Sequence, residues 1–115
     1  MKSPITTHVL DTSRGRPASG VKAVLELRTS PEGWKELGRG ETDADGRIAG
    51  LLPAGSKLTP GTYRLTFQTA AYHGAAGTPG FYPEVAVSFE VKDPGQHYHV
   101  PLLLSPFGYA TYRGT

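Results

Sequence analysis

The end of the chain carries residue types whose spacing suits catalysis. His97 and His99 are two residues apart, so on a strand their side chains would point to the same face. Histidine exchanges a proton near neutral pH, because its ordinary pKa is about 6.5. The chain closes with Tyr112-Arg113-Gly114-Thr115, which adds a phenol, a cation and a carboxylate. This pattern predicts a C-terminal segment whose polar groups face a partner surface.

A hairpin would position these groups. The run Val100–Leu104 is apolar enough to be buried, and Ser105-Pro106-Phe107-Gly108 is typical of a turn. A second short strand would then begin at Tyr109. Burial of both faces of the run 100–104 would give one face to a core and the other to a subunit contact.

Short apolar runs separated by Gly and Pro predict strands along the rest of the chain. The pair Asp45-Gly46 predicts a hairpin turn, and Gly38 and Gly40 predict bulges or close backbone approach. Thr69 is a candidate N-cap of a short helix, and His73 at its end is expected to be exposed. The predicted strands are 5–10, 21–28, 34–42, 47–49, 62–68 and 84–91, with the helix at 69–73. With the C-terminal hairpin, this gives about eight strands and one helix, an all-β sandwich.

Composition limits the classes of function. The chain has 115 residues, which suits a single domain over 1–115, and 37% of them are hydrophobic. The net charge is +2 with no basic block, which argues against nucleic-acid binding. There is no cysteine, which excludes disulfides and thiolate metal sites. No apolar run approaches the roughly 20 residues that cross a bilayer, and the start lacks an apolar signal core. We therefore expect a cytoplasmic protein.

Four segments together carry a resemblance to a known family. The segments are His8-Val9-Leu10-Asp11-Thr12, Asp45-Gly46-Arg47, the run His97–Pro106 (HYHVPLLLSP) and the terminal Tyr112-Arg113-Gly114-Thr115. They resemble the transthyretin-like 5-hydroxyisourate hydrolases over nearly the whole chain. His8, Arg47, His99 and the YRG tail match the enzymes of this family rather than transthyretin, the hormone carrier.

The resemblance implies a transthyretin-like sandwich of two sheets and eight strands, with a short helix after the fifth. It implies a homotetramer, arranged as a dimer of dimers, with active sites in the channel between the dimers. The implied reaction is hydrolytic ring opening of 5-hydroxyisourate, without metal or cofactor. The family tail is usually YRGS, whereas here the last residue is Thr115. Threonine keeps the hydroxyl and adds a methyl group.

The residue chemistry agrees with this activity. His99 and His8 would position and deprotonate a water molecule, with His99 preferred as the base. Arg47 offers a rigid fork of donors that would bind the substrate and stabilise an oxyanion. Tyr112, Arg113, Gly114 and Thr115 would bind substrate and close the pocket. His97 is expected to be a structural residue with a surface or interface hydrogen bond.

Two other classes of protein remain open at this stage. A carrier of small hydrophobic ligands would line its channel with apolar groups, Lys and Glu rather than His and Arg. A plain interaction module would not bring His8, Arg47, His99 and Tyr112 together. A metal site at His97, His99 and His8 is a weak alternative, because no carboxylate stands at motif spacing.

Overall fold

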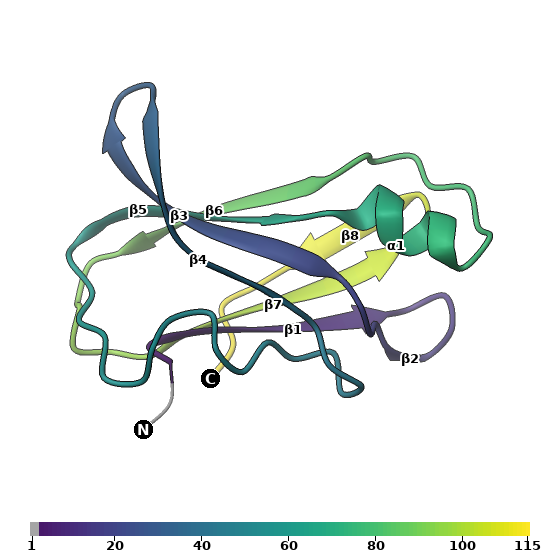
Figure 1. Ribbon diagram of the computed structural model, residues 1–115, viewed down its shortest axis with the longest axis horizontal. Coiled ribbons are helices and arrows are strands. Elements are labelled where there is room, and N and C mark those ends of the chain that lie inside the picture. Colours follow the sequence, from purple (N-terminus) through teal and green to yellow (C-terminus); the bar gives the residue numbers. More distant parts are fainter. Residues whose placement is uncertain (1–2) are drawn as a thin grey trace.

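The chain folds into two four-stranded sheets packed face to face (Figure 1), in a computed structural model that describes residues 3–115. The first sheet has the order β2-β1-β7-β8, with β2 at Arg16–Pro17, β1 at Ile5–Asp11, β7 at Tyr98–Ser105 and β8 at Gly108–Thr111. The second has the order β4-β3-β5-β6, with β4 at Gly33–Glu41, β3 at Lys22–Ser30, β5 at Gly61–Phe67 and β6 at Val85–Val91. Helix α1 (Thr69–Ala75) follows β5. The predicted all-β sandwich, with its C-terminal hairpin, is confirmed.

Alternation along the strands decides which side chains enter the core. In β1, Ile5 and Val9 are fully buried, while Thr6 and His8 between them are only half-buried. In β7, Val100 and Leu102 are likewise buried, and His99 is half-buried. Apolar side chains from both sheets form one core between the layers. Thr6 and His8 of β1 and His99 of β7 therefore lie on the outer face of the first sheet, whereas Thr7 and Asp11 alternate with them and are buried.

The predicted strand at 47–49 is wrong. Gly46 turns the chain with a φ of 78°, but Arg47 does not return along β4. It forms an isolated antiparallel bridge with His8 of β1, and the Val9 amide donates to the Gly46 carbonyl at 2.8 Å. Because β2 pairs with only Leu10 and Asp11, the β1 edge nearby is left for Gly46 and Arg47 to occupy.

The glycines of β4 behave as predicted. The β3–β4 register shifts after the pair of Leu25 with Gly38. A Cβ at Gly38 would collide with the carbonyl oxygen of Leu51. The segment after β4 thus packs directly on the strand backbone.

Two predictions about the helix are wrong. The N-cap is Gln68 and makes no side-chain cap hydrogen bond, whereas the Thr69 hydroxyl donates to the Tyr82 carbonyl at 3.0 Å. His73 is buried, with 4% of its surface exposed. The loop after the helix folds back over it, so that a Cβ on Gly80 would lie 2.8 Å from His73 Cδ2. Among residues 3–115, no helix is long and apolar enough to cross a membrane.

A buried carboxylate ties the helix to the end of β1. Asp11 accepts hydrogen bonds from the Tyr72 hydroxyl at 2.6 Å and the Ser13 hydroxyl at 2.7 Å, and from the amides of Ser13 and Arg14. Burial acts to raise the pKa of Asp11, but these hydrogen bonds outweigh it and lower the pKa below its usual range. Burial, and then the carboxylate itself, raise the pKa of Tyr72 to about 12. The charged form of Asp11 therefore stabilises the fold.

We expect Tyr72→Phe to lower the free energy of unfolding by about 1.5–3 kcal/mol at pH 7, since it removes a hydrogen bond to a buried charge. Because the folded pKa of Asp11 is depressed, this contribution is complete above the unfolded pKa of about 3.9. It is lost as the pH falls through the folded pKa. Urea unfolding at pH 7 and at pH 3 measures the difference.

The matched control is Tyr109→Phe, because Tyr109 is 43% exposed on β8. We expect the free energy of unfolding of this variant to stay within about 0.5 kcal/mol of the wild-type value. Two results would contradict the role given to Asp11. One is an equal loss of unfolding free energy in the two variants, and the other is a Tyr72→Phe loss that is as large at pH 3 as at pH 7.

Candidate active site

The pairing of β1 with β7 builds the candidate site. The two strands run parallel, and their register sets Thr6 opposite His99 and His8 opposite Pro101. Thr6, His8 and His99 are half-buried on the outer face of the first sheet, whereas Pro101 is buried. The His8–Arg47 bridge brings Arg47 to the same region. The structure therefore gathers His8, Arg47 and His99 from three distant parts of the chain, as the sequence predicts.

His8 has a defined proton position. Its Nε2 lies 2.8 Å from the carbonyl oxygen of Asp45. A carbonyl oxygen can only accept, so Nε2 must carry the hydrogen. When the ring is neutral, the lone pair is then on Nδ1. His8 can therefore accept a hydrogen bond or a proton through Nδ1 while the turn 43–46 holds the ring.

His99 is held neutral by its surroundings. Burial lowers its pKa below the usual value, and the charges of Arg47, His8 and His97 lower it further. One ring nitrogen, Nδ1, lies 2.8 Å from the Thr6 hydroxyl. The lowered pKa means that His99 is uncharged at pH 7 and free to accept a proton. This is the state that a general base requires.

Arg47 brings a cation without a fixed partner. Its side chain is exposed and, within residues 3–115, makes no hydrogen bond or salt bridge. Its backbone is fixed, because the Arg47 amide donates to Asp43 Oδ1 at 3.1 Å and its carbonyl accepts from the Asp43 amide at 2.8 Å. The guanidinium is thus free to bind an anionic or carbonyl-rich ligand.

The C-terminal tail closes onto His99 through its backbone. The Gly114 amide donates to the His99 carbonyl at 2.8 Å. A Cβ at position 114 would lie 2.5 Å from His99 Cδ2 and 3.3 Å from Pro101 Cγ. Only glycine allows this approach without displacing the imidazole ring. Thr115 follows and is exposed.

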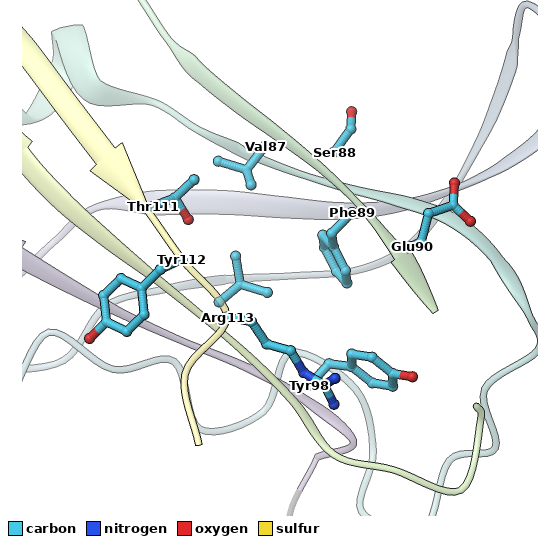
Figure 2. A pocket seen from close by; sticks show the side chains of 9 residues that line it. Val87, Ser88, Phe89, Glu90, Tyr98, Thr111, Tyr112 and Arg113 are labelled. Atoms are coloured by element: carbon cyan, nitrogen blue, oxygen red, sulfur yellow. The ribbon is translucent and has the colours of Figure 1, made fainter. Parts of the chain in front are cut away.

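The structure turns the Arg113 side chain toward Tyr98 rather than toward His8 or His99. Its guanidinium lies 4.5 Å over the Tyr98 ring and donates to Gln96 Oε1 at 2.8 Å and the His97 carbonyl at 3.3 Å. Figure 2 shows the Arg113 side chain reaching toward Tyr98, while Tyr112 points the other way. Arg113 anchors the tail to the start of β7, and this anchor holds Gly114 against His99.

Tyr112 is 56% exposed and lines a cavity of about 280 Å³ between β6 and the β7–β8 hairpin. Val87, Phe89 and Tyr98 contribute apolar walls (Figure 2), and Val100 also lines the cavity. This cavity lies beside the Arg113 anchor rather than at the histidines. The Tyr112 side chain therefore does not line the site around His99. Tyr112 is connected to that site only because Gly114, two residues further along, packs on His99.

Sequence reasoning missed Thr6. Its hydroxyl lies 2.8 Å from His99 Nδ1 and 2.9 Å from His97 Nε2. The available signal was its spacing of two residues from His8, which places both on one face of a strand. His97 makes the surface hydrogen bond predicted for it. Among residues 3–115, no group of three His, Cys, Asp or Glu side chains is placed to hold a metal ion.

The fold and the site define a β-sandwich protein with a histidine–arginine centre on the outer face of one sheet. A family model described as "HIUase/Transthyretin family" matches residues 5–114. The chain belongs to this family.

Proteins similar to this chain include both a hydrolase and a transthyretin. The chain is 48% identical to the 5-hydroxyisourate hydrolase of Mus musculus, over 98% of this chain and 96% of the relative. Among solved structures, 5-hydroxyisourate hydrolase of Klebsiella pneumoniae matches with a TM-score of 0.82 and 35% identity, over 96% and 98% of the two chains. Sea bream transthyretin in complex with thyroxine matches with a TM-score of 0.90 and 34% identity, over 98% and 96%.

The structure of (S)-allantoin synthase also matches, with a TM-score of 0.86 and 38% identity, but this chain spans only 43% of that longer one. The hydrolase and the transthyretin thus share the backbone fold of this chain to a similar degree. Only the side chains of the site can separate the two functions.

Proposed function

We propose that this protein is a 5-hydroxyisourate hydrolase that converts its substrate to 2-oxo-4-hydroxy-4-carboxy-5-ureidoimidazoline in urate degradation. In this proposal one domain over residues 1–115 carries the activity, with no metal or cofactor. The observation that supports it most is the gathering of His99, Arg47 and His8 on one face, where burial and the neighbouring charges lower the pKa of His99. A carrier of hydrophobic ligands has no use for a base and a free guanidinium there. The 45–48% identity to 5-hydroxyisourate hydrolases of Salmonella and mouse points the same way.

The chemistry is hydrolysis of a ring C–N bond. His99 takes a proton from a water molecule, and the water oxygen forms a bond to the ring carbonyl carbon. The carbonyl oxygen gains negative charge, which the Arg47 guanidinium stabilises. Collapse of this intermediate breaks the C–N bond, and the leaving nitrogen receives the proton from His99. His8 orients the water through Nδ1, the nitrogen that its bond to Asp45 leaves free.

The tail completes the pocket in this proposal. The backbone of Gly114 packs on His99, and Thr115, which follows it, closes the site on the solvent side. Arg113 contributes by anchoring this segment to Gln96 and to the backbone of His97. Substrate binding by the tail would thus depend on an anchor that does not itself touch the ring.

Activity should depend on Arg47 and His99. With 5-hydroxyisourate generated from urate by urate oxidase, we expect Arg47→Ala to lower kcat/KM by about 10²–10³-fold, because it removes the oxyanion's cation. We expect a loss of about 10²–10⁴-fold for His99→Gln, because it removes the base. The measurement is the ultraviolet decay of the substrate, and circular dichroism checks folding.

The control is Arg39→Ala, since Arg39 is an exposed arginine on the other sheet, paired with Glu36. Its activity should equal that of wild type. A wild-type protein that fails to accelerate the decay would refute the hydrolase and favour the carrier. An active wild type with an equally active Arg47→Ala variant would refute the role of Arg47.

We propose further that the protein is a homotetramer built as a dimer of dimers. Two unpaired edge strands support this: β6 ends one sheet and β8 ends the other. Both border the cavity lined by Tyr112 and Arg113, so the two edges lie on the same side of the sandwich. Exposed edge strands readily pair with another chain. The exposed rings of Phe81, Phe107 and Tyr109 add apolar surface nearby.

Light scattering coupled to size exclusion tests the assembly. A tetramer of 12.3 kDa chains has a mass of about 49 kDa, and we expect this value at micromolar concentration. A stable mass of 12.3 kDa would contradict the tetramer. An active monomer would also show that the catalytic site is complete within one chain.

A further inference from the structure

The Thr6 hydroxyl stands between two histidines. Its Oγ1 lies 2.9 Å from His97 Nε2 and 2.8 Å from His99 Nδ1. A hydroxyl has a single hydrogen. If Thr6 donates to one of these rings, it must accept from the other. The protonation of His97 Nε2 and of His99 Nδ1 is therefore coupled through one oxygen atom.

From this geometry we propose that Thr6 relays protons between the site base His99 and the exposed His97, and that it sets which nitrogen of His99 carries the hydrogen. This inference rests on the proposed hydrolase for its catalytic meaning. Thr6 acts as a positioning residue, and His97 serves as the exchange point with solvent.

Two hydrogen-bond arrangements satisfy all three groups. In the first, Thr6 donates to His97 Nε2 and accepts from His99 Nδ1–H, so the lone pair of His99 is on Nε2. In the second, Thr6 donates to His99 Nδ1 and accepts from His97 Nε2–H, so His99 carries its hydrogen on Nε2. The first arrangement gives His99 the base form at Nε2, and the second gives it the acid form at the same atom.

Passing one proton along the chain converts the first arrangement into the second. His99 takes the water proton on Nε2 and passes its Nδ1 proton to Thr6. Thr6 passes its own hydrogen to His97 Nε2, and His97 releases the Nδ1 proton to solvent. The reverse transfer returns a proton when His99 Nε2 gives one to the leaving nitrogen. Every proton is conserved, and no step needs a further reactant.

The charges around the relay favour release of the proton outward. Burial opposes a lasting imidazolium at His99, and the charges of Arg47, His8 and His97 oppose it further. His97 is exposed, so its charge is screened by water. The Arg113 guanidinium donates to the His97 carbonyl, which fixes the His97 backbone beside the relay.

The strand offers a matched pair of threonines. Thr6 and Thr7 are neighbours, and each uses its hydroxyl toward β7: Thr6 toward the histidines, Thr7 toward the Val100 carbonyl at 2.7 Å. Valine keeps the shape and the strand preference of threonine without the hydroxyl. Thr6→Val removes the relay, Thr6→Ser retains it, and Thr7→Val removes an equivalent hydroxyl from the buried face.

Steady-state kinetics of 5-hydroxyisourate hydrolysis tests the relay. We expect Thr6→Val to lower kcat by about 10- to 100-fold, with KM within about twofold and a displaced acid limb of the pH profile. Thr6→Ser should keep wild-type kcat, and folded Thr7→Val should do the same. His97→Gln should lose kcat and regain part of it in imidazole buffer. Equal kcat in Thr6→Val and wild type, or equal losses in Thr6→Val and Thr7→Val, would overturn the relay.

A second readout does not depend on turnover. Nitrogen-15 shifts of the two rings report which nitrogens carry hydrogen, and in the wild type we expect titration of His97 to move the His99 shifts. Thr6→Val should remove the exchange of hydrogen between His99 Nδ1 and Nε2 that accompanies this titration, and leave only the through-space effect of the His97 charge. If the rings titrate independently, the relay is refuted even in an active enzyme. If they are linked in a protein that does not open the substrate ring, the relay stands and the hydrolase proposal fails.

Discussion

The in-register parallel pairing of β1 with β7 is the constraint on which the rest of the site depends. It sets Thr6 opposite His99 and leaves both on the outer face, while Ile5, Val9, Val100 and Leu102 fill the core. A slip of one residue would turn the polar set inward and the apolar set outward. The free energy of burying the apolar set therefore also fixes the positions of the site histidines.

Two other segments complete the site by docking on this strand pair. The turn 43–46 delivers Arg47 and holds the His8 ring through the Asp45 carbonyl. The tail lays Gly114 against His99, and the Arg113 anchor keeps it there. The electrostatic result is a half-buried imidazole among positive groups, which stays neutral and is ready to take a proton. The turn thus supplies the positive charge of Arg47 and the tail supplies close packing, and both act on the ring of His99.

Sequence patterns predict well what alternation controls. The strands 5–10, 62–68 and 84–91, the C-terminal hairpin and the convergence of His8, Arg47 and His99 follow from periodicity and from family resemblance. Contacts decided by tertiary packing were not predictable in the same way. Arg47 bridges β1 instead of starting a strand, His73 is buried by a returning loop, and Arg113 turns to Tyr98. The role of Thr6 depends on a parallel register that local sequence does not encode.

The pH dependence of kcat/KM for 5-hydroxyisourate hydrolysis tests most directly the claim that a neutral His99 is the base. The account predicts an acid limb with a midpoint below the ordinary histidine pKa of about 6.5, because burial and neighbouring charge lower the pKa of His99. Activity should be full above that midpoint and fall as the pH drops through it. In Arg47→Met, which removes the charge, the midpoint should move upward. A midpoint at or above 6.5 in the wild type, or one unmoved by loss of Arg47, would contradict the account.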